Sequence, residues 1–152
     1  MLILAFEMSS SHPSVALTDG KNIQLSHQWS DPRLAGKEMF DVLKTISAKG
    51  ISWGDIDAFA VGRGPGNYSG LRASITMAQS LALPNDTPVF ALSSGLILAD
   101  SIFSNQSTQQ IRIVGDARRN ELWHAAFTQT KDGATYQNQS WERCRPEDFP
   151  AL

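Results

Sequence analysis

A short apolar segment and a predicted helix are separated by closely spaced glycines at positions 62, 64, 66 and 70. Glycine tolerates a positive φ and lets a ligand approach the backbone closely. The helix that follows directs N–H groups and partial positive charge into this loop, beside Arg63 and Arg72. The pattern fits an anion site, and it fits equally a tight turn in which glycine serves geometry alone. The candidate anion-site residues are Arg63, Gly64, Gly66, Ser69, Gly70 and Arg72.

Two common phosphate-binding motifs are not present in this loop. A dinucleotide-binding G-x-G-x-x-G motif would need glycine where the chain has Asn67 or Ser69. A P-loop would need a lysine, and residues 51–130 contain none. We therefore interpret the loop mainly as the turn that starts the next helix, with anion binding by Arg63 and Arg72 as the secondary interpretation.

Other residues that carry chemistry form weak patterns. Glu7 and Asp116 each follow an apolar segment and are weak candidates for a divalent cation, which prefers carboxylate ligands. The histidines show no spacing typical of a metal site. The serines before His12 fit a polar turn better than a nucleophile with its base. We therefore expect a protein that is not an enzyme, with no catalytic residue, metal or cofactor of its own.

Composition narrows the class of protein. The chain has 152 residues, of which 41% are hydrophobic, and this suits one medium domain or a domain with a fragment. Its formal charge of −2 provides no general attraction to nucleic acid, so any RNA contact is expected to be local or made by a partner. The single Cys144 and the lack of a signal peptide at residues 1–6 predict a cytoplasmic protein that does not enter a membrane.

Hydrophobic patterning predicts an α/β fold built on a mixed sheet. Strands are predicted at 2–6, 14–18, 22–29, 56–61 and 89–92, and helices at 31–49, 69–83 and 94–103. Asp31 is expected to cap the first helix and Gly50 to end it. The order βββαβαβα places antiparallel strands first and then crossovers whose helices cover the sheet. These elements form a predicted N-terminal lobe, residues 1–105.

After a polar linker at 104–110 the pattern begins again. Strands are predicted at 111–116, 122–128 and 136–141. Residues 145–148 resemble the first turn of a helix. We therefore predict that residues 106–152 are a partial second copy of a ribonuclease H-like unit, consisting mainly of strands, with Glu7 and Asp116 in equivalent positions.

The helix predicted at 69–83 carries two apolar stripes. One stripe is expected to cover the sheet, and the other, with Ala73, Met77 and Leu81, faces nearly the opposite way. The second stripe needs another protein, unless neighbouring helices of the same domain bury it. Small side chains permit close helix approach, and Phe40 lies off the core face of the helix before. The predicted partner interface comprises Phe40, Leu43, Ala73, Met77, Ser80 and Leu81.

Several segments together resemble the bacterial TsaB (YeaZ) family. They are residues 3–9, 62–72, 89–94 and 116–123. The glycine run is the specific part, reading G-R-G-P-G-N-Y-S-G-L-R where the family usually has G-R-G-P-G-S-F-T-G-L-R. The similarity spans nearly the whole chain, and it implies an actin-like ATPase fold of the sugar-kinase and ribonuclease H type.

The resemblance also implies a function. In that family TsaB is the non-catalytic member that pairs with its relative TsaD, and with the ATPase TsaE, to make N6-threonylcarbamoyladenosine on tRNA. It implies that helices 31–49 and 69–83 pack against those of TsaD, or of a second copy in a homodimer, with tRNA contacted only indirectly. ATP and Mg²⁺ would bind only at the interface with a partner. A phosphotransferase of the actin and sugar-kinase type, and a glycoprotease-type peptidase, remain as alternatives.

The chain departs from the family pattern at three places. Glu7-Met8 stands where relatives usually have Asp-Thr, and residues 31–33 stand near the place where relatives usually open the first helix with His-Ser. The second-lobe helices of full-length relatives are also missing. A closed nucleotide cleft between two lobes is therefore not expected.

Overall fold

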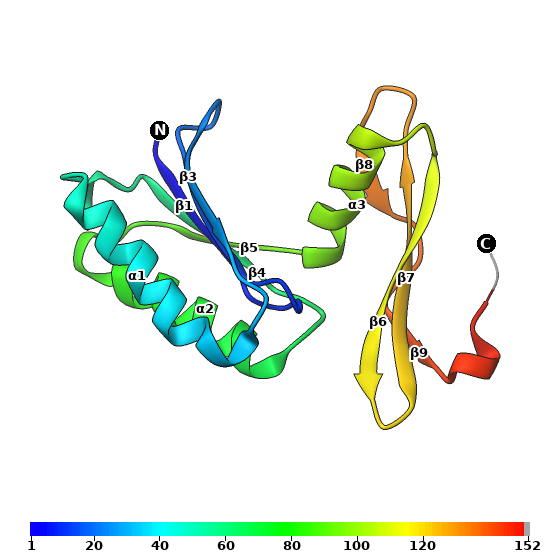
Figure 1. Ribbon diagram of the computed structural model, residues 1–152. Helices are drawn as coiled ribbons and strands as arrows, with labels where there is room; N and C mark the ends of the chain where they lie inside the picture. Colours follow the sequence, from blue (N-terminus) through cyan, green and yellow to red (C-terminus); the bar gives the residue numbers. More distant parts are fainter. Residues whose placement is uncertain (151–152) are drawn as a thin grey trace. The chain divides into compact units, whose positions relative to one another are not determined.

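The first strands form an antiparallel meander in the computed structural model, which describes residues 1–150 apart from the side chain of Pro32. They are β1 (Ile3–Glu7), β2 (Ser14–Thr18) and β3 (Ile23–Gln28). β4 (Ala58–Gly62) lies parallel to β1, and β5 (Val89–Leu92) lies parallel to β4, which gives the order β3-β2-β1-β4-β5 (Figure 1). The mixed sheet and the element order confirm the predicted fold class.

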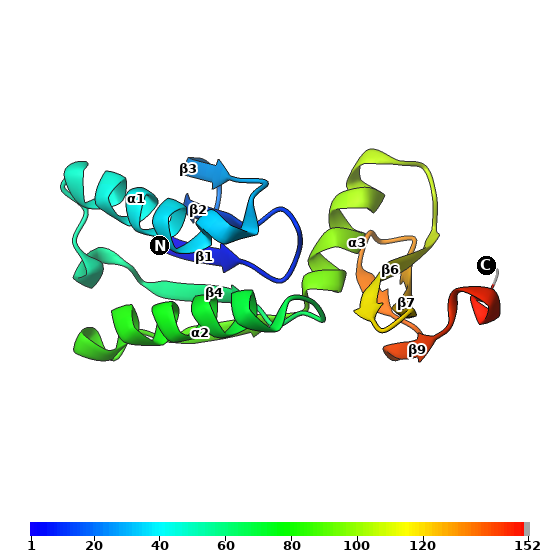
Figure 2. The same cartoon turned by 60° about the horizontal axis from the view of Figure 1, so that its bottom comes forward.

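Two crossover helices cover one face of this sheet (Figure 2). α1 (Ala35–Ala48) connects β3 to β4, and α2 (Tyr68–Ala82) connects β4 to β5. β1 buries Leu4 and Phe6 and leaves Ile3, Ala5 and Glu7 half-buried, because successive side chains point to opposite faces. The helices bury Met39, Val42, Leu43, Ile46, Ala78 and Ala82 in the same core.

The first helix begins one turn later than predicted. Pro32–Leu34 form a 3-10 turn, and α1 begins at Ala35. Asp31 Oδ1 accepts a hydrogen bond from the backbone N–H of Arg33 at 3.0 Å, while the Arg33 guanidinium donates to the same carboxylate. These bonds lower the pKa of the Asp31 carboxyl. Asp31 therefore stabilises the turn and is not the cap of α1, because its short side chain bonds the backbone two residues on.

The second unit consists of α3 (Ser94–Asn105) and an antiparallel sheet. β6 (Gln110–Arg118), β7 (Glu121–Gln129) and β8 (Thr135–Gln137) are neighbours in that order, and β9 (Glu142–Cys144) also pairs with β7. α3 buries Ala99 and Phe103 against Ile113 and Phe127 of the sheet. The chain therefore divides into Met1–Leu92 and Ser93–Leu152, before α3 and not after residue 105 as predicted, because α3 packs on the second sheet.

Three further predictions for this unit need correction. The strand predicted at 136–141 ends at Gln137, and the backbone N–H of Asn138 donates to the Ala126 carbonyl at 3.0 Å. Asp116 lies inside β6, opposite Leu122, where a strand end was predicted. Pro146–Asp148 form a single 3-10 turn, where the start of a helix was predicted.

The helices are short. α1 has 14 residues, α2 has 15 and α3 has 12, whereas a membrane span needs about 20 apolar residues. Among residues 1–150 no helix has both the length and the apolar character to cross a bilayer.

Phe103→Ala tests the assignment of α3 to the second unit. Because Phe103 is 5% exposed, the substitution is expected to lower the free energy of unfolding of that unit by about 3–5 kcal/mol. Ile97→Ala, on the same helix but 46% exposed, should cost less than about 1 kcal/mol. Hydrogen exchange of β7 amides measures both. Faster exchange confined to β1, β2 and β4 after Phe103→Ala would contradict the assignment.

Candidate functional site

The glycine loop between β4 and α2 packs directly on the loop that follows β1. A Cβ atom at Gly70 would collide with the Met8 carbonyl oxygen, and one at Gly66 with the Ser9 carbonyl oxygen. The backbone N–H of Asn67 donates to that Ser9 oxygen at 2.7 Å. Glycine is needed here because the chain's own backbone occupies the space that a side chain would take.

The N-terminus of α2 is capped by the chain itself. Asn67 Oδ1 accepts hydrogen bonds from the N–H groups of Ser69 at 3.0 Å and Gly70 at 3.2 Å. Those N–H groups are among the donors that an anion would use. Gly64 has a φ of 79°, as a tight turn requires, and the Arg63 backbone N–H donates to the Leu92 carbonyl at 2.8 Å. The contacts favour the turn interpretation of the loop over the anion site.

The two candidate metal ligands belong to different units. Glu7 Oε1 accepts a hydrogen bond from the Ser9 N–H at 2.7 Å, and its other carboxylate oxygen is buried without a hydrogen-bond partner. Asp116 is exposed and lies 3.5 Å from the Arg118 guanidinium. No three His, Cys, Asp or Glu side chains of residues 1–150 come together as a metal would require. Glu7 and Asp116 remain weak candidates.

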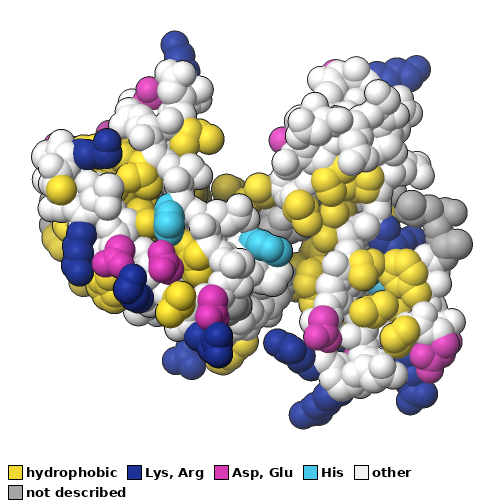
Figure 3. Space-filling model, viewed as in Figure 1, with side chains coloured by type: hydrophobic (Ala, Val, Ile, Leu, Met, Phe, Trp, Pro, Cys, Tyr) yellow, Lys and Arg dark blue, Asp and Glu magenta, His cyan; other side chains and the backbone are white. Residues whose placement is uncertain are grey.

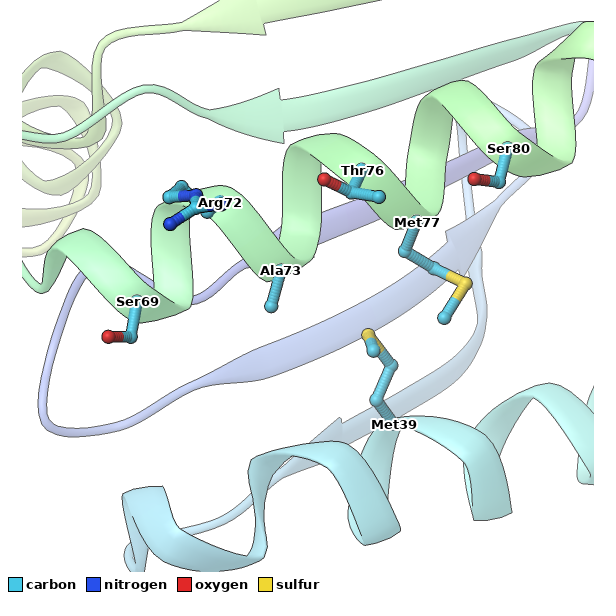
Figure 4. Close-up of a pocket in the computed structure, with 7 residues that line it drawn as sticks. All are labelled: Met39, Ser69, Arg72, Ala73, Thr76, Met77 and Ser80. Atoms are coloured by element: carbon cyan, nitrogen blue, oxygen red, sulfur yellow. The ribbon is translucent and has the colours of Figure 1, made fainter.

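A groove of about 480 Å³ runs between α1 and α2. It is lined by Met39, Ser69, Arg72, Ala73, Thr76, Met77 and Ser80. The α2 residues recur at intervals of three and four, so they share one helix face. Figure 4 shows Met39 of α1 and Met77 of α2 pointing toward each other across the groove. The groove therefore combines an apolar contact between the helices with small and polar side chains along α2.

Three of the six predicted interface residues line this groove. Ala73, Met77 and Ser80 line it, and Phe40 is on α1 with 53% of its surface exposed. Leu43 is 6% exposed and lies in the core. It belongs to the face of α1 that covers the sheet and does not line the groove, and its place in the interface stays a prediction.

The other predicted interface residue is Leu81, and two groove-lining residues were not predicted. Leu81 is half-buried and packs against the core, as Met77 does, but it does not line the groove. Met39 and Thr76 line the groove but were not predicted. Helical spacing places Thr76 on the same face of α2 as Ser69 and Ser80, so the sequence could have predicted it. Met39 could be found only once α1 was placed beside α2.

The charged side chains of α1 form ion pairs with one another. The groove contains one charged side chain, Arg72, that forms no ion pair within residues 1–150. Lys37 Nζ lies 3.0 Å from Asp41 and Lys44 Nζ lies 3.5 Å from the same carboxylate. The hydrogen bond from Lys37 lowers the pKa of Asp41. Figure 3 shows acidic and basic side chains next to one another over α1. The Arg72 guanidinium lies 5.5 Å from the centre of the Tyr68 ring, and within residues 1–150 no acid lies within ion-pair distance of it.

Similarity to known proteins covers the elements that form this groove. The family model described as TsaD, tRNA N6-adenosine threonylcarbamoyltransferase, matches residues 37–140. The solved structure of YeaZ from Pseudomonas aeruginosa has a TM-score of 0.84 and 30% sequence identity, over 99% of this chain and 70% of that chain. This chain belongs to the TsaB (YeaZ) family.

Curated members of the TsaB family carry a functional name. The tRNA threonylcarbamoyladenosine biosynthesis protein TsaB of Escherichia coli is 28% identical over 148 residues, which are 97% of this chain and 64% of that protein. The protein of the same name from Haemophilus influenzae is 29% identical over 133 residues, which are 86% of this chain and 56% of that protein. The chain therefore spans less than two thirds of these relatives. Their names support the tRNA-modification interpretation, and neither the phosphotransferase nor the peptidase alternative.

Gly70→Ala tests the close approach at the glycine loop. It is expected to lower the free energy of unfolding by about 3 kcal/mol or more, since the backbone must move to admit the methyl group. Gly36→Ala in α1 is the control, because its Cβ would meet no atom within 4 Å, and it should be neutral or stabilising by up to about 1 kcal/mol. Urea unfolding measures both, and equal stability of the two variants would contradict the contact.

Proposed function

We propose that this chain is a non-catalytic scaffold subunit that binds a TsaD-like protein in the synthesis of N6-threonylcarbamoyladenosine on tRNA. The observation that carries the proposal is the groove between α1 and α2, on a chain of the TsaB family. A TsaE-like ATPase completes the assembly. The formal charge of −2 supports indirect contact with tRNA, made through the partner.

The groove has the properties of a helix-docking surface. Ala73, Ser69 and Ser80 are small, so the backbone of another helix can approach α2 closely. The methionine side chains adapt their shape to an incoming surface. Phe40, exposed beside charged residues of α1, provides an aromatic anchor of the kind that dominates interface energies. A second copy of the chain fits the same description, and we propose that it occupies the groove when no partner is present.

Local contacts support a non-catalytic role for the glycine loop. The Asn67 side chain accepts hydrogen bonds from two N–H groups at the start of α2. The Met8 and Ser9 carbonyls fill the space that side chains at the glycines would take. Glu7 accepts the Ser9 N–H. We propose that the chain binds no cofactor alone, and that ATP and Mg²⁺ bind only where a partner completes the site.

Met77→Glu and Phe40→Glu are each expected to abolish co-purification with the TsaD-like protein of the same organism. A carboxylate in the apolar contact would be desolvated without a partner. Phe40 is exposed, whereas Met77 is half-buried and packs against the core, so the fold of Met77→Glu has to be verified. Ile23→Glu is the control, because Ile23 is 69% exposed on β3. Circular dichroism checks the fold. Unchanged co-purification of both Met77→Glu and Phe40→Glu would contradict the proposed interface.

Calorimetric titration of the chain alone with ATP and Mg²⁺ is expected to give no binding heat at micromolar concentrations. The physical reason is that the donors at the start of α2 are already satisfied by Asn67. The same titration of Asn67→Ala separates capping from ligand binding, because loss of the cap should cost about 1 kcal/mol of stability without creating a nucleotide site. Micromolar binding by the unmodified chain would overturn the non-catalytic assignment.

A further inference from the structure

We infer that Arg72, held by Tyr68, binds a carboxylate on the partner helix that fills the groove between α1 and α2. The inference rests on the proposed function and adds the chemistry that the partner must present. That chemistry is an apolar helix face with an aspartate or glutamate placed against the second turn of α2.

The first step is the charge of the groove. Arg72 is the one charged residue of α2, and the other groove-lining residues are neutral. The nearby charges of α1 are already engaged, with Lys37 and Lys44 on Asp41, and Glu38 on His27 at 2.9 Å. The empty groove therefore presents a single positive charge that the described residues leave uncompensated.

The second step is the cost of covering that charge. A helix docked on Ala73 and Met77 removes water from Arg72, which lines the same groove. Burying an unpaired guanidinium is strongly unfavourable, whereas a carboxylate that accepts its hydrogen bonds offsets the desolvation free energy. A wholly apolar occupant would therefore bind worse than one that carries an acid at this position.

The third step is preorganisation. Tyr68 lies one turn before Arg72 on α2, and its ring faces the guanidinium at 5.5 Å. A guanidinium stacked on an aromatic ring keeps its hydrogen-bonding edges available, and less side-chain entropy is lost when it binds. Tyrosine and arginine are also the residue types enriched among interface hot spots. Tyr68 and Arg72 thus form the polar end of a groove whose other contacts are apolar or small.

Arg63 provides a matched comparison within the same sequence run. It is exposed, as Arg72 is, but it does not line the groove. Its substitution removes the same charge from the same unit without touching the proposed contact.

The test measures binding of the TsaD-like protein of the same organism by calorimetry at low and high salt. Arg72→Ala is expected to weaken binding about tenfold or more and to reduce its salt dependence, and Arg72→Lys to recover part of the affinity. Arg63→Ala should bind as the unmodified chain does. The inference is overturned if Arg72→Ala binds with unchanged affinity and salt dependence while Met77→Glu does not bind. If Met77→Glu also binds normally, the proposed function itself fails.

Charge reversal identifies the acid. Arg72→Glu should not bind, and replacing each interface aspartate or glutamate of the TsaD-like protein with arginine in turn should restore binding at one position. Restoration supports the inference and names the carboxylate. Failure of every reversal, with both proteins folded by circular dichroism, contradicts a direct ion pair.

Discussion

The approach of the glycine loop to the Met8 and Ser9 carbonyls determines where α2 lies on the first sheet. The loop meets these atoms without any intervening side chain, and Asn67 adds a hydrogen bond to Ser9. α2 therefore starts close to the sheet and can remain close only with small core residues. Ser74 and Ala78 of α2 are completely buried, and the Ser74 hydroxyl donates to the Leu71 carbonyl at 3.0 Å. The position at which α2 begins therefore determines which of its faces turns toward the sheet and which turns toward the groove.

Glycine-rich strand-to-helix turns have two physical uses that sequence spacing does not separate. One is to make room for a ligand, and the other is to make room for another part of the chain. The atoms that fill the space decide between them. Here they are backbone carbonyl oxygens, which carry partial negative charge and would repel a phosphate placed beside them. The glycines thus serve the packing of two loops, and this is compatible with a protein that supports a reaction carried out elsewhere.

The element order could be predicted because it depends on local signals. Apolar segments such as Leu2 to Phe6 and turn residues such as Asp19-Gly20 belong to the chain itself. Two errors have long-range or context-dependent causes. The start of α1 depended on whether Asp31 bonds a helix or a turn, and a sequence pattern permits both. The sheet on which α3 packs was decided by tertiary contacts.

The candidate site likewise contains residues that the sequence could predict and residues that depend on the folded arrangement. Helical spacing found Ala73, Met77 and Ser80, because residues three and four apart share a face. Met39 lies across the groove on another helix, and no periodicity within α2 reports it. That no acid of residues 1–150 lies within ion-pair distance of Arg72 is likewise a property of the fold.

The hydroxyl groups of Ser69, Thr76 and Ser80 have a consequence for how the groove is shared. These hydroxyl groups can hydrogen-bond water when nothing is bound, which would keep the uncovered state accessible and let occupants exchange without unfolding. One groove accommodates one occupant, so a second copy bound there as proposed would compete with any complex with another protein. By mass action, the apparent affinity for a different protein then falls as the concentration of the chain rises. The relative abundance of the two proteins, and not their contacts alone, would determine how much of the mixed assembly forms.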